Sequence, residues 1–402
     1  MSLTRTLATS LTLALVAIGA LAPAAGADST PTAEDRRVVV EEGALPVLTP
    51  EDAEAIRLHT SRALADRSAQ AGGPDTGITT ATVNPVVTRH SGDDRYSTAA
   101  ALANTMWRDA IWADVDGAPF PYDKVVFVAS GHDFPDALAG GALAAYYGGP
   151  TLLTRKDGLP GPTRQALAGL DPDYIVVLGG AGAVSDPVIW ALADYVPHMQ
   201  RVVRYGGDDR YQVSAGIART IFDHGFGQRA YVALGTNWPD GLAGGAAAGW
   251  DKAPLLLTRQ DSVPGVVLQT LAQGQPEEIV LLGGRNAVSD AVAEQLETVA
   301  PVVRVGGTDR FSVAANVARL HPTRYGATVA SGQNWPDALA GSAYAGLVGD
   351  KLLLVRSSGL PAATRRMVVD EALALIDALG GLGPLPDEVL DELRSLEVPT
   401  PG

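Results

Sequence analysis

The segment Arg204-Tyr-Gly-Gly-Asp-Asp-Arg-Tyr211 decides the fold, because the chain contains three versions of it. The other two are Arg89-His-Ser-Gly-Asp-Asp-Arg-Tyr96 and Arg304-Val-Gly-Gly-Thr-Asp-Arg-Phe311. All three match the pattern R-x-x-G-x-D-R followed by an aromatic residue. A period of about 100 residues is the size of a small domain and far exceeds one turn of a solenoid. The sequence therefore predicts three tandem domains.

Three further blocks follow each copy in the same order, which makes the repeat a specific signal. The first is an aromatic-Pro-Asp block: Phe134-Pro-Asp136-Ala-Leu-Ala-Gly140, Trp238-Pro-Asp240-Gly-Leu-Ala-Gly244 and Trp335-Pro-Asp337-Ala-Leu-Ala-Gly341. The second is leucine-rich and ends in an arginine: Leu152-Leu-Thr-Arg155, Leu256-Leu-Thr-Arg259 and Leu353-Leu-Val-Arg356. The third contains a glycine pair: Val177-Leu-Gly-Gly180, Leu281-Leu-Gly-Gly284 and Ala378-Leu-Gly-Gly381. The repeats extend over residues 86–200, 201–301 and 302–398.

Within a repeat, apolar stretches alternate with segments of helical periodicity. In the second repeat the expected strands are 202–205, 230–234, 254–258 and 278–282, and the expected helices are 209–222, 239–250, 263–271 and 290–299. This alternation predicts a parallel sheet covered on both faces. The fold class is therefore α/β, with three tandem Rossmann-like parallel-sheet units. Asp377 lies inside the fourth strand of the third repeat and predicts a weakened or edge strand there.

The helix after each aromatic-Pro-Asp block consists mostly of small residues. These helices are 137–145, 242–249 and 338–347. Alanine and glycine leave little side-chain volume, so such a face is stable only when another backbone lies close to it. The sequence therefore predicts that the three helices pack against one another in a pseudo-threefold arrangement.

The first 27 residues have the features of an export signal. Arg5 is the only charged residue before Asp28, an apolar run extends from Leu11 to Leu21, and Ala25-Gly-Ala27 is typical of a cleavage site. An uncleaved membrane anchor is the alternative, since the uncharged stretch is just long enough to span a bilayer. Residues 28–84 are expected to be a variable region and linker, with one helix over 49–67 capped by Thr49.

Composition excludes several classes of function. The formal net charge is −15, from 30 basic and 45 acidic residues, so binding to nucleic acid through bulk positive charge is not expected. The chain has no cysteine, which excludes a disulfide scaffold, a cysteine nucleophile and cysteine-ligated metal.

The repeated aspartates have a structural interpretation. Those of the aromatic-Pro-Asp blocks, Asp136, Asp240 and Asp337, complement the positive end of the following helix, with Asp133, Asn237 and Asn334 as its expected N-caps. A direct contact with a ligand is the alternative. The aspartates of the first motif are expected to cap the first helix of each repeat, which follows them: Asp94, Asp209 and Asp309.

Two sets of arginines are candidates for anion binding. Arg155, Arg259 and Arg356 each follow an apolar strand, and open parallel sheets bind ligands beyond the carboxyl ends of their strands. A guanidinium can hold a phosphate or carboxylate with two hydrogen bonds. Arg95, Arg210 and Arg310 follow the capping aspartates, where an ion pair is the alternative to a ligand contact.

Catalysis and nucleotide binding find little support. None of the six histidines recurs at an equivalent position, and His132 with Asp133 is the only candidate catalytic pair. The glycine pairs resemble half of a dinucleotide fingerprint, but the full G-x-G-x-x-G is missing. A strand-to-helix turn that needs positive φ is the alternative interpretation.

Together these blocks resemble the cell wall-binding repeat family, type 2, of secreted Gram-positive proteins. The match rests on the R-x-x-G-x-D-R-Y segment, the stretch Ser130–Gly140, the strand Pro150–Thr154 and the stretch Ile175–Ser185. The resemblance implies three Rossmann-like units arranged around a pseudo-threefold axis within one chain. The third repeat departs from the pattern at Ala378 and at Lys351–Arg356.

The resemblance also implies a function: non-covalent attachment of a secreted protein to an anionic cell wall polymer, with no enzyme activity and no cofactor. The expected location is the cell wall or cell surface, where neighbouring surface proteins are possible partners. Two other functions stay open at this point, a structural surface-layer protein and a small-molecule-binding or enzymatic protein on the same fold.

Overall fold

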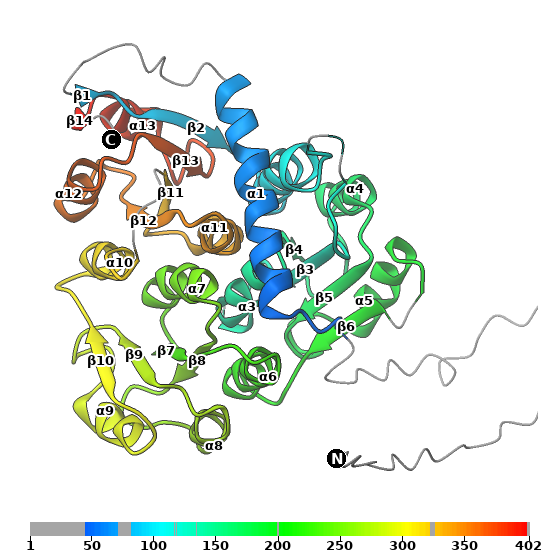
Figure 1. The fold of residues 1–402 in the computed structure, drawn as a ribbon, viewed down its shortest axis with the longest axis vertical. Helices are drawn as coiled ribbons and strands as arrows, with labels where there is room; N and C mark the ends of the chain where they lie inside the picture. The colour runs from blue at the N-terminus through cyan, green and yellow to red at the C-terminus, as the bar shows by residue number, and fades with distance from the viewer. Residues whose placement is uncertain are drawn as a thin grey trace, which may run out of the picture. The chain divides into compact units, whose positions relative to one another are not determined.

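The computed structural model describes residues 45–70, 82–115, 117, 119–133, 135–198, 201–321 and 326–399. For residues 66–70 it describes the backbone alone. The predicted signal, residues 1–27, and most of the expected linker lie outside the described residues. Within the described part, no helix is long and apolar enough to cross a membrane. This part forms three parallel sheets with helices between and around them (Figure 1).

Each sheet has four parallel strands in the order second, first, third, fourth. The first sheet contains β3 (Val125–Ser130), β4 (Thr151–Thr154), β5 (Tyr174–Leu178) and β6 (Val202–Tyr205). The second contains β7 (Arg229–Leu234), β8 (Leu255–Thr258), β9 (Glu278–Leu282) and β10 (Val302–Val305). The third contains β11 (Gly326–Ser331), β12 (Lys351–Val355), β13 (Leu375–Leu379) and β2 (Val86–His90). The three parallel-sheet units confirm the predicted α/β fold.

Helices connect the strands and cover the sheets. The first strand of each repeat leads into α2 (Arg95–Leu102), α6 (Arg210–Asp223) or α10 (Arg310–Ala318), and α2 continues as a π-helical segment over Ala103–Ile111. The small-residue helices are α3 (Pro135–Tyr146), α7 (Pro239–Asp251) and α11 (Trp335–Val348). The remaining helices of the repeats are α4 (Gly161–Leu170), α5 (Asp186–Leu192), α8 (Gly265–Gly274), α9 (Asp290–Glu297), α12 (Ala362–Asp370) and α13 (Asp387–Arg394).

The sheets do not coincide with the sequence repeats, because the first strand of each repeat pairs with the third strand of the sheet before it. Strand β6 of the second repeat pairs with β5, and β10 of the third repeat pairs with β9. The third sheet is completed by β2, which comes from the start of the first repeat and pairs with β13. Strand β1 (Thr82–Val83) pairs with β14 (Val398–Pro399) beside it. The three repeats therefore form a closed, non-covalent ring.

The first arginine of each repeated motif holds the exchanged strand in place. Arg204 on β6 donates hydrogen bonds to the carbonyl oxygens of Gly179 (3.0 Å) and Val184 (2.8 Å), and it pairs with Asp186 (3.1 Å). The same clamp recurs at the other two sheets: Arg304 contacts Gly283, Val288, Ser289 and Asp290, and Arg89 contacts Gly380, Leu385 and Asp387. Arg89 thus joins parts of the chain almost 300 residues apart.

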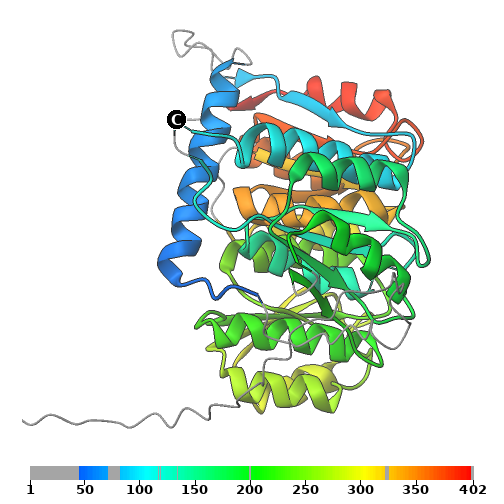
Figure 2. The same cartoon turned by 90° about the vertical axis from the view of Figure 1, so that its right-hand side faces the viewer.

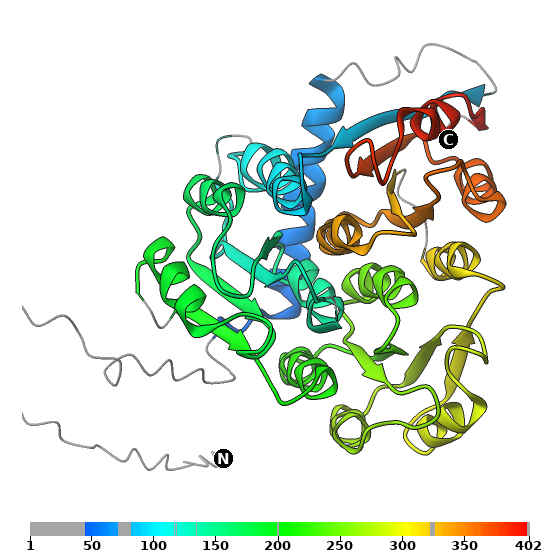
Figure 3. The ribbon, with the colours of Figure 1, turned by 180° about the vertical axis from the view of Figure 1, so that it is seen from behind.

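The three small-residue helices pack against one another at the centre of the ring, as the sequence predicts (Figures 1 and 3). A β-carbon at Gly249 would lie 2.6 Å from Ala145 and 3.3 Å from Gly346, so only glycine permits this approach. Ser342 of α11 donates to the carbonyl oxygen of Leu242 (3.3 Å). The contacts between the three helices follow the same order from the amino to the carboxyl end of each helix, so the helices are parallel. Their aromatic-Pro-Asp ends therefore lie together at one end of the ring.

Helix α1 (Pro50–Gln70) covers the opposite end (Figure 2). Thr49 caps it through a hydrogen bond from the amide of Asp52 (3.2 Å), which confirms the predicted helix start. Ile56 is buried against Gly148, just past the end of α3, and Arg57 lies over the ring of Trp250 at the end of α7 (5.7 Å). The helix is therefore part of the packed core and not a free linker.

The prediction of a weakened or edge strand at Asp377 is wrong as to its place, because β13 lies between β11 and β2. The Asp377 carboxylate instead accepts from His90 Nε2 (2.6 Å) on the neighbouring strand β2 and from the Tyr344 hydroxyl (3.0 Å). Asp350 lies close by, partly buried, and accepts from the Thr328 hydroxyl (3.3 Å). Burial and the nearby Asp377 raise the pKa of Asp350 to about 8.

This raised pKa gives the folding stability a dependence on pH. Between about pH 4 and 8 the folded chain holds a proton on Asp350 that the unfolded chain has lost, so stability falls as pH rises through this range. The Asp350→Asn variant lacks this titration. We expect its melting temperature to exceed that of the parent by more at pH 8 than at pH 5, with a change of at least about 2 °C. Asp93→Asn, at an exposed site, is the matched control. Parallel melting curves for parent and Asp350→Asn would contradict the prediction.

Candidate ligand sites at the junctions between repeats

The repeated motifs meet where two neighbouring repeats join, at the carboxyl ends of the strands. At the junction of the third and first repeats, the Arg95 guanidinium lies over the Trp335 ring (5.7 Å). At the junction of the second and third repeats, Arg310 lies over Trp238 (5.3 Å). Each site is therefore built from two repeats that are consecutive around the ring.

The capping aspartates of the first motif have the expected structural role. Asp94 accepts from the amide of Ser97 (2.8 Å), Asp209 from those of Tyr211 and Gln212 (3.0 and 2.9 Å), and Asp309 from that of Ser312 (2.8 Å). Burial disfavours ionisation of Asp94 and Asp309, but hydrogen bonds from the two serines outweigh it and hold the pKa of both carboxyls below its usual range. Asp94 and Asp309 are therefore ionised, and the hydrogen bonds of all three aspartates fix the helix starts.

The arginines that follow these caps hold the loop after the first inner strand of each repeat. Arg210 donates to the carbonyl oxygen of Gly235 (2.6 Å), and Arg310 donates to that of Gly332 (2.6 Å). Arg95 contacts the carbonyl oxygen of Gly131 in the same way. Part of each guanidinium is thus engaged in fixing the loop.

The arginines that follow the leucine-rich strands are exposed and stack on the aromatic residue of the first motif. Arg155 lies over Tyr96 (5.3 Å), Arg259 over Tyr211 (4.9 Å) and Arg356 over Phe311 (4.3 Å). Among the residues that the structure describes, the side chains of Arg155 and Arg259 have no hydrogen-bond or ion-pair partner. Arg356 differs, because it pairs with Asp309 (3.4 Å). Two of the three sites therefore present a guanidinium whose donors are available.

The aspartates of the aromatic-Pro-Asp blocks lie in the first turn of the central helices, as expected. Asp337 is only 5% exposed, and Asp136 and Asp240 are partly buried. Burial raises the pKa of Asp136, Asp240 and Asp337 to about 6, and an arginine of the following repeat opposes the shift in each case. The expected N-cap at Asn237 is wrong, because Trp238 is the N-cap of α7. Asn334 is the N-cap of α11, as expected, but its side chain makes no capping hydrogen bond.

The first glycine of each Gly-Gly pair makes room for these aspartates. Gly179, Gly283 and Gly380 have φ of 112°, 106° and 133°. A β-carbon at these positions would lie 2.6, 2.8 and 3.0 Å from the carboxylate oxygens of the three aspartates. The pairs are therefore turns that need positive φ, the second interpretation of the sequence.

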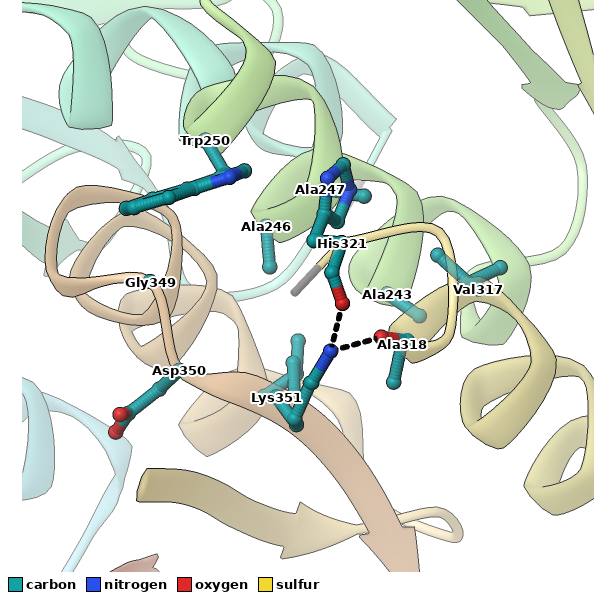
Figure 4. A pocket seen from close by; sticks show the side chains of 11 residues that line it. Ala243, Ala246, Ala247, Trp250, Val317, Ala318, His321, Gly349, Asp350 and Lys351 are labelled. Carbon is teal, nitrogen blue, oxygen red and sulfur yellow. Dashed lines mark hydrogen bonds between the residues drawn. The ribbon is translucent and has the colours of Figure 1, made fainter. Parts of the chain in front are cut away.

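The remaining candidates do not assemble into a catalytic or metal site. His132 is exposed and contacts the Tyr96 hydroxyl (3.1 Å) rather than Asp133. In the described ranges, no three histidine, aspartate or glutamate side chains are grouped so that they could hold a metal ion. A hollow of about 20 Å³ beside Lys351 is too small for a ligand, and the lysine ammonium already contacts the carbonyl oxygens of Ala318 and His321 (Figure 4).

The fold defines a protein built from three α/β repeats that close into a ring, and comparison with known proteins identifies its family. The model of the cell wall binding domain 2 matches residues 89–189, 204–293 and 304–390. The chain belongs to this family.

Curated relatives share the repeats and extend beyond them. The chain is 28% identical to the amidase enhancer of Bacillus subtilis over 309 residues. This alignment covers 77% of this chain and 40% of the relative. It is 23% identical to the N-acetylmuramoyl-L-alanine amidase LytC of the same organism, over 79% of this chain and 60% of the relative. The chain thus spans about half the length of these relatives.

Solved structures share the fold. Cwp6 from Clostridium difficile matches with a TM-score of 0.70 and 24% identity, over 80% of this chain and 50% of that one. Cwp8 from the same organism matches with a TM-score of 0.65 and 21% identity, over 82% and 53% of the two chains.

The loop-holding arginines should affect stability first. Arg210→Ala removes a charge-assisted hydrogen bond to Gly235 that joins a helix start to a strand end. We expect it to lower the free energy of unfolding by about 1–3 kcal/mol, measured by urea denaturation. Arg366→Ala, at an exposed position of α12, is the control and should change it by less than about 0.5 kcal/mol. If the two variants had the same free energy of unfolding, the structural role assigned to Arg210 would be contradicted.

Proposed function

We propose that the protein attaches non-covalently to the cell wall by binding an anionic wall glycopolymer at the junctions between its repeats. Membership of the cell wall binding domain 2 family supports attachment to the wall. The observation that carries the choice of an anionic ligand is the pair of exposed guanidinium groups of Arg155 and Arg259. Each lies over a tyrosine ring and has no hydrogen-bond or ion-pair partner among the described residues.

A stacked guanidinium is well suited to this task. The ring of Tyr96 or Tyr211 restricts the arginine side chain, so less rotamer freedom is lost when a ligand binds. The planar fork can then hold a phosphate or carboxylate through two parallel hydrogen bonds. Single contacts of this kind are weak at an exposed site, but a polymer can occupy several of them and gain avidity.

Local electrostatics offset the acidic charge of the whole chain. The net charge of −15 repels a polyanion at long range. At the junctions, however, the amino ends of α3, α7 and α11 lie at one end of the ring and carry partial positive charge. Two sets of arginines add to this field. The polymer therefore meets a favourable patch on an otherwise unfavourable surface, and we expect its binding to be sensitive to salt.

The three junctions are chemically unequal. Arg155 and Arg259 stack on tyrosines and have available donors, whereas Arg356 stacks on Phe311 and pairs with Asp309. The ion pair must be broken before Arg356 can receive an anion. We therefore propose two binding junctions, with the junction of the second and third repeats serving assembly of the ring.

Wall binding by the double variant Arg155→Ala/Arg259→Ala tests the proposed function. Loss of a charge-assisted hydrogen bond at each junction should weaken binding to purified Bacillus subtilis wall sacculi by about tenfold per site. The melting temperature should stay within about 1 °C of the parent, because neither side chain holds a described residue by a hydrogen bond.

The double variant Arg62→Ala/Arg366→Ala removes the same charge from exposed positions elsewhere and serves as the control. Sacculi stripped of anionic polymer by acid should retain neither the parent nor the control. Equal retention of both double variants on intact sacculi would contradict the proposed sites. Failure of the parent to bind intact sacculi would contradict the function itself.

The inequality of the junctions has its own test. Arg356→Ala removes an arginine that is already paired with Asp309, so retention on sacculi should fall by less than about twofold, against about tenfold for Arg155→Ala. The measurement is a binding isotherm on intact sacculi for each single variant. An equal loss in both variants would mean that all three junctions bind the polymer.

A further inference from the structure

The residue that follows the loop glycine differs in chemistry among the three junctions. An arginine contacts the carbonyl oxygen of this glycine at each junction, and the three glycines are Gly131, Gly235 and Gly332. The residues that follow them are His132, Thr236 and Gln333. Their side chains start from equivalent positions, so they can give the junctions different ligand preferences without a change of fold.

We infer that His132 is a ligand-binding residue of the junction between the third and first repeats, where its imidazole and the Arg155 guanidinium together hold an anionic group of the polymer. This inference rests on the proposed function and deepens it for one site. A protonated imidazole makes charge-assisted hydrogen bonds to phosphate or carboxylate, so this junction should bind more tightly as the pH falls.

Tyr96 brings the imidazole and the guanidinium together. The Arg155 guanidinium lies over the Tyr96 ring (5.3 Å), and His132 Nε2 is hydrogen-bonded to the Tyr96 hydroxyl (3.1 Å). The loop lies against the edge of the same ring, since a β-carbon at Gly131 would be 2.7 Å from Cε1 of Tyr96. Both His132 and Arg155 are exposed. An anion held by Arg155 is therefore a near neighbour of the imidazole.

The loop that carries His132 is fixed before a ligand arrives. The buried Ser130 hydroxyl accepts hydrogen bonds from the amides of His132 and Asp133 (3.2 Å each). Arg95 contacts the carbonyl oxygen of Gly131 between them. Among the described residues, Tyr96 is the only side chain that contacts the imidazole, so Nδ1 is available to a ligand. Little conformational freedom is lost when such a group binds.

The other two junctions lack this arrangement. At the junction of the first and second repeats, Thr236 has no titratable group, and the Tyr211 hydroxyl has no hydrogen-bond partner among the described residues. At the junction of the second and third repeats, the Gln333 side chain accepts from the amide and the hydroxyl of Ser357 (3.0 Å each), and Phe311 has no hydroxyl. A histidine anchored on a tyrosine therefore distinguishes one junction from its two equivalents.

Protonation of His132 adds positive charge where the ligand binds. Histidine is the side chain whose charge changes between pH 5 and 8. A neutral imidazole donates one hydrogen bond, whereas the protonated form donates two. The charged groups around it come from its own loop, from α2, from the end of β4 and from α3: Asp133, Asp94, Arg95, Arg155 and Asp136. The aspartates offset the two arginines, so a proton on the imidazole increases the attraction for an anion.

The single variant Arg259→Ala isolates this junction, because it removes the available guanidinium of the other binding junction. Its affinity for intact Bacillus subtilis sacculi should rise about threefold to tenfold between pH 8 and pH 5.5. Adding His132→Gln, which keeps a side chain able to bond the Tyr96 hydroxyl, should remove most of this rise. Adding His198→Gln instead is the matched control, since His198 is exposed elsewhere, and it should leave the rise intact.

A gain of function at the second junction gives an independent measurement. In the Arg155→Ala background, Thr236→His places an imidazole next to the loop glycine beside Tyr211 and should confer a rise of similar size between pH 8 and pH 5.5. Such a gain cannot come from misfolding, and a melting curve verifies the fold of each variant.

The outcomes separate this inference from the proposed function. An equal pH dependence with and without His132→Gln would overturn the role of His132 while the proposed function stands, and absence of any gain from Thr236→His would also count against it. Failure of the parent to bind sacculi at both pH values would overturn the proposed function and the inference together.

Discussion

The exchange of one strand between neighbouring repeats is the constraint on which the rest of the structure depends. The strand is secured by an arginine that reaches across to the carbonyl oxygens of the preceding Gly-Gly turn. Arg204 is only 9% exposed, and burial lowers its pKa even though Asp186 opposes the shift. A guanidinium so far from water is tolerable only because its donors are satisfied. Removing the carbonyl partners by unfolding one repeat would therefore destabilise the strand of the next.

Strand exchange also explains why the candidate ligand sites lie between repeats and not within them. The exchanged strand leads directly into the capping aspartate and its arginine, so these residues are delivered to the edge of the preceding sheet. The aromatic-Pro-Asp block already lies at that edge, at the amino end of a central helix. Because the central helices are parallel, all three junctions lie at one end of the ring. Helix α1 covers the other end, where the central helices have their carboxyl ends. The end that carries the arginines is the one at which we propose that the polymer binds.

Much of this could be predicted from the sequence, and the failures have physical causes. The repeat order, the strands, the helices and the packing of the small-residue helices all follow from local pattern. The offset between repeats and sheets does not follow from local pattern. In a cyclic order of strands and helices, the sequence does not show whether the first strand of a repeat joins its own sheet or the preceding one. Asn237 and Asn334 have the chemistry of caps but make none of the expected bonds. Arg204 and its equivalents were visible in the motif, but their carbonyl partners belong to another repeat. The burial of Asp136 likewise depends on a neighbour that sequence spacing cannot place.

Two polar residues of the third sheet explain why β2 pairs with this sheet and not with one of the two similar sheets. Strand β2 carries His90, whose imidazole contacts Asp377 on β13 and is almost fully buried. The positions that correspond to Asp377 in the other sheets are Val176 and Val280, both fully buried. A β2 strand paired with either of those sheets would bury His90 without its carboxylate partner, at a cost of about 1–3 kcal/mol. Conversely, β6 or β10 in the third sheet would leave Asp377 without the histidine. The pair therefore discriminates among three otherwise similar sheet edges and directs β2, from the start of the first repeat, to the third sheet.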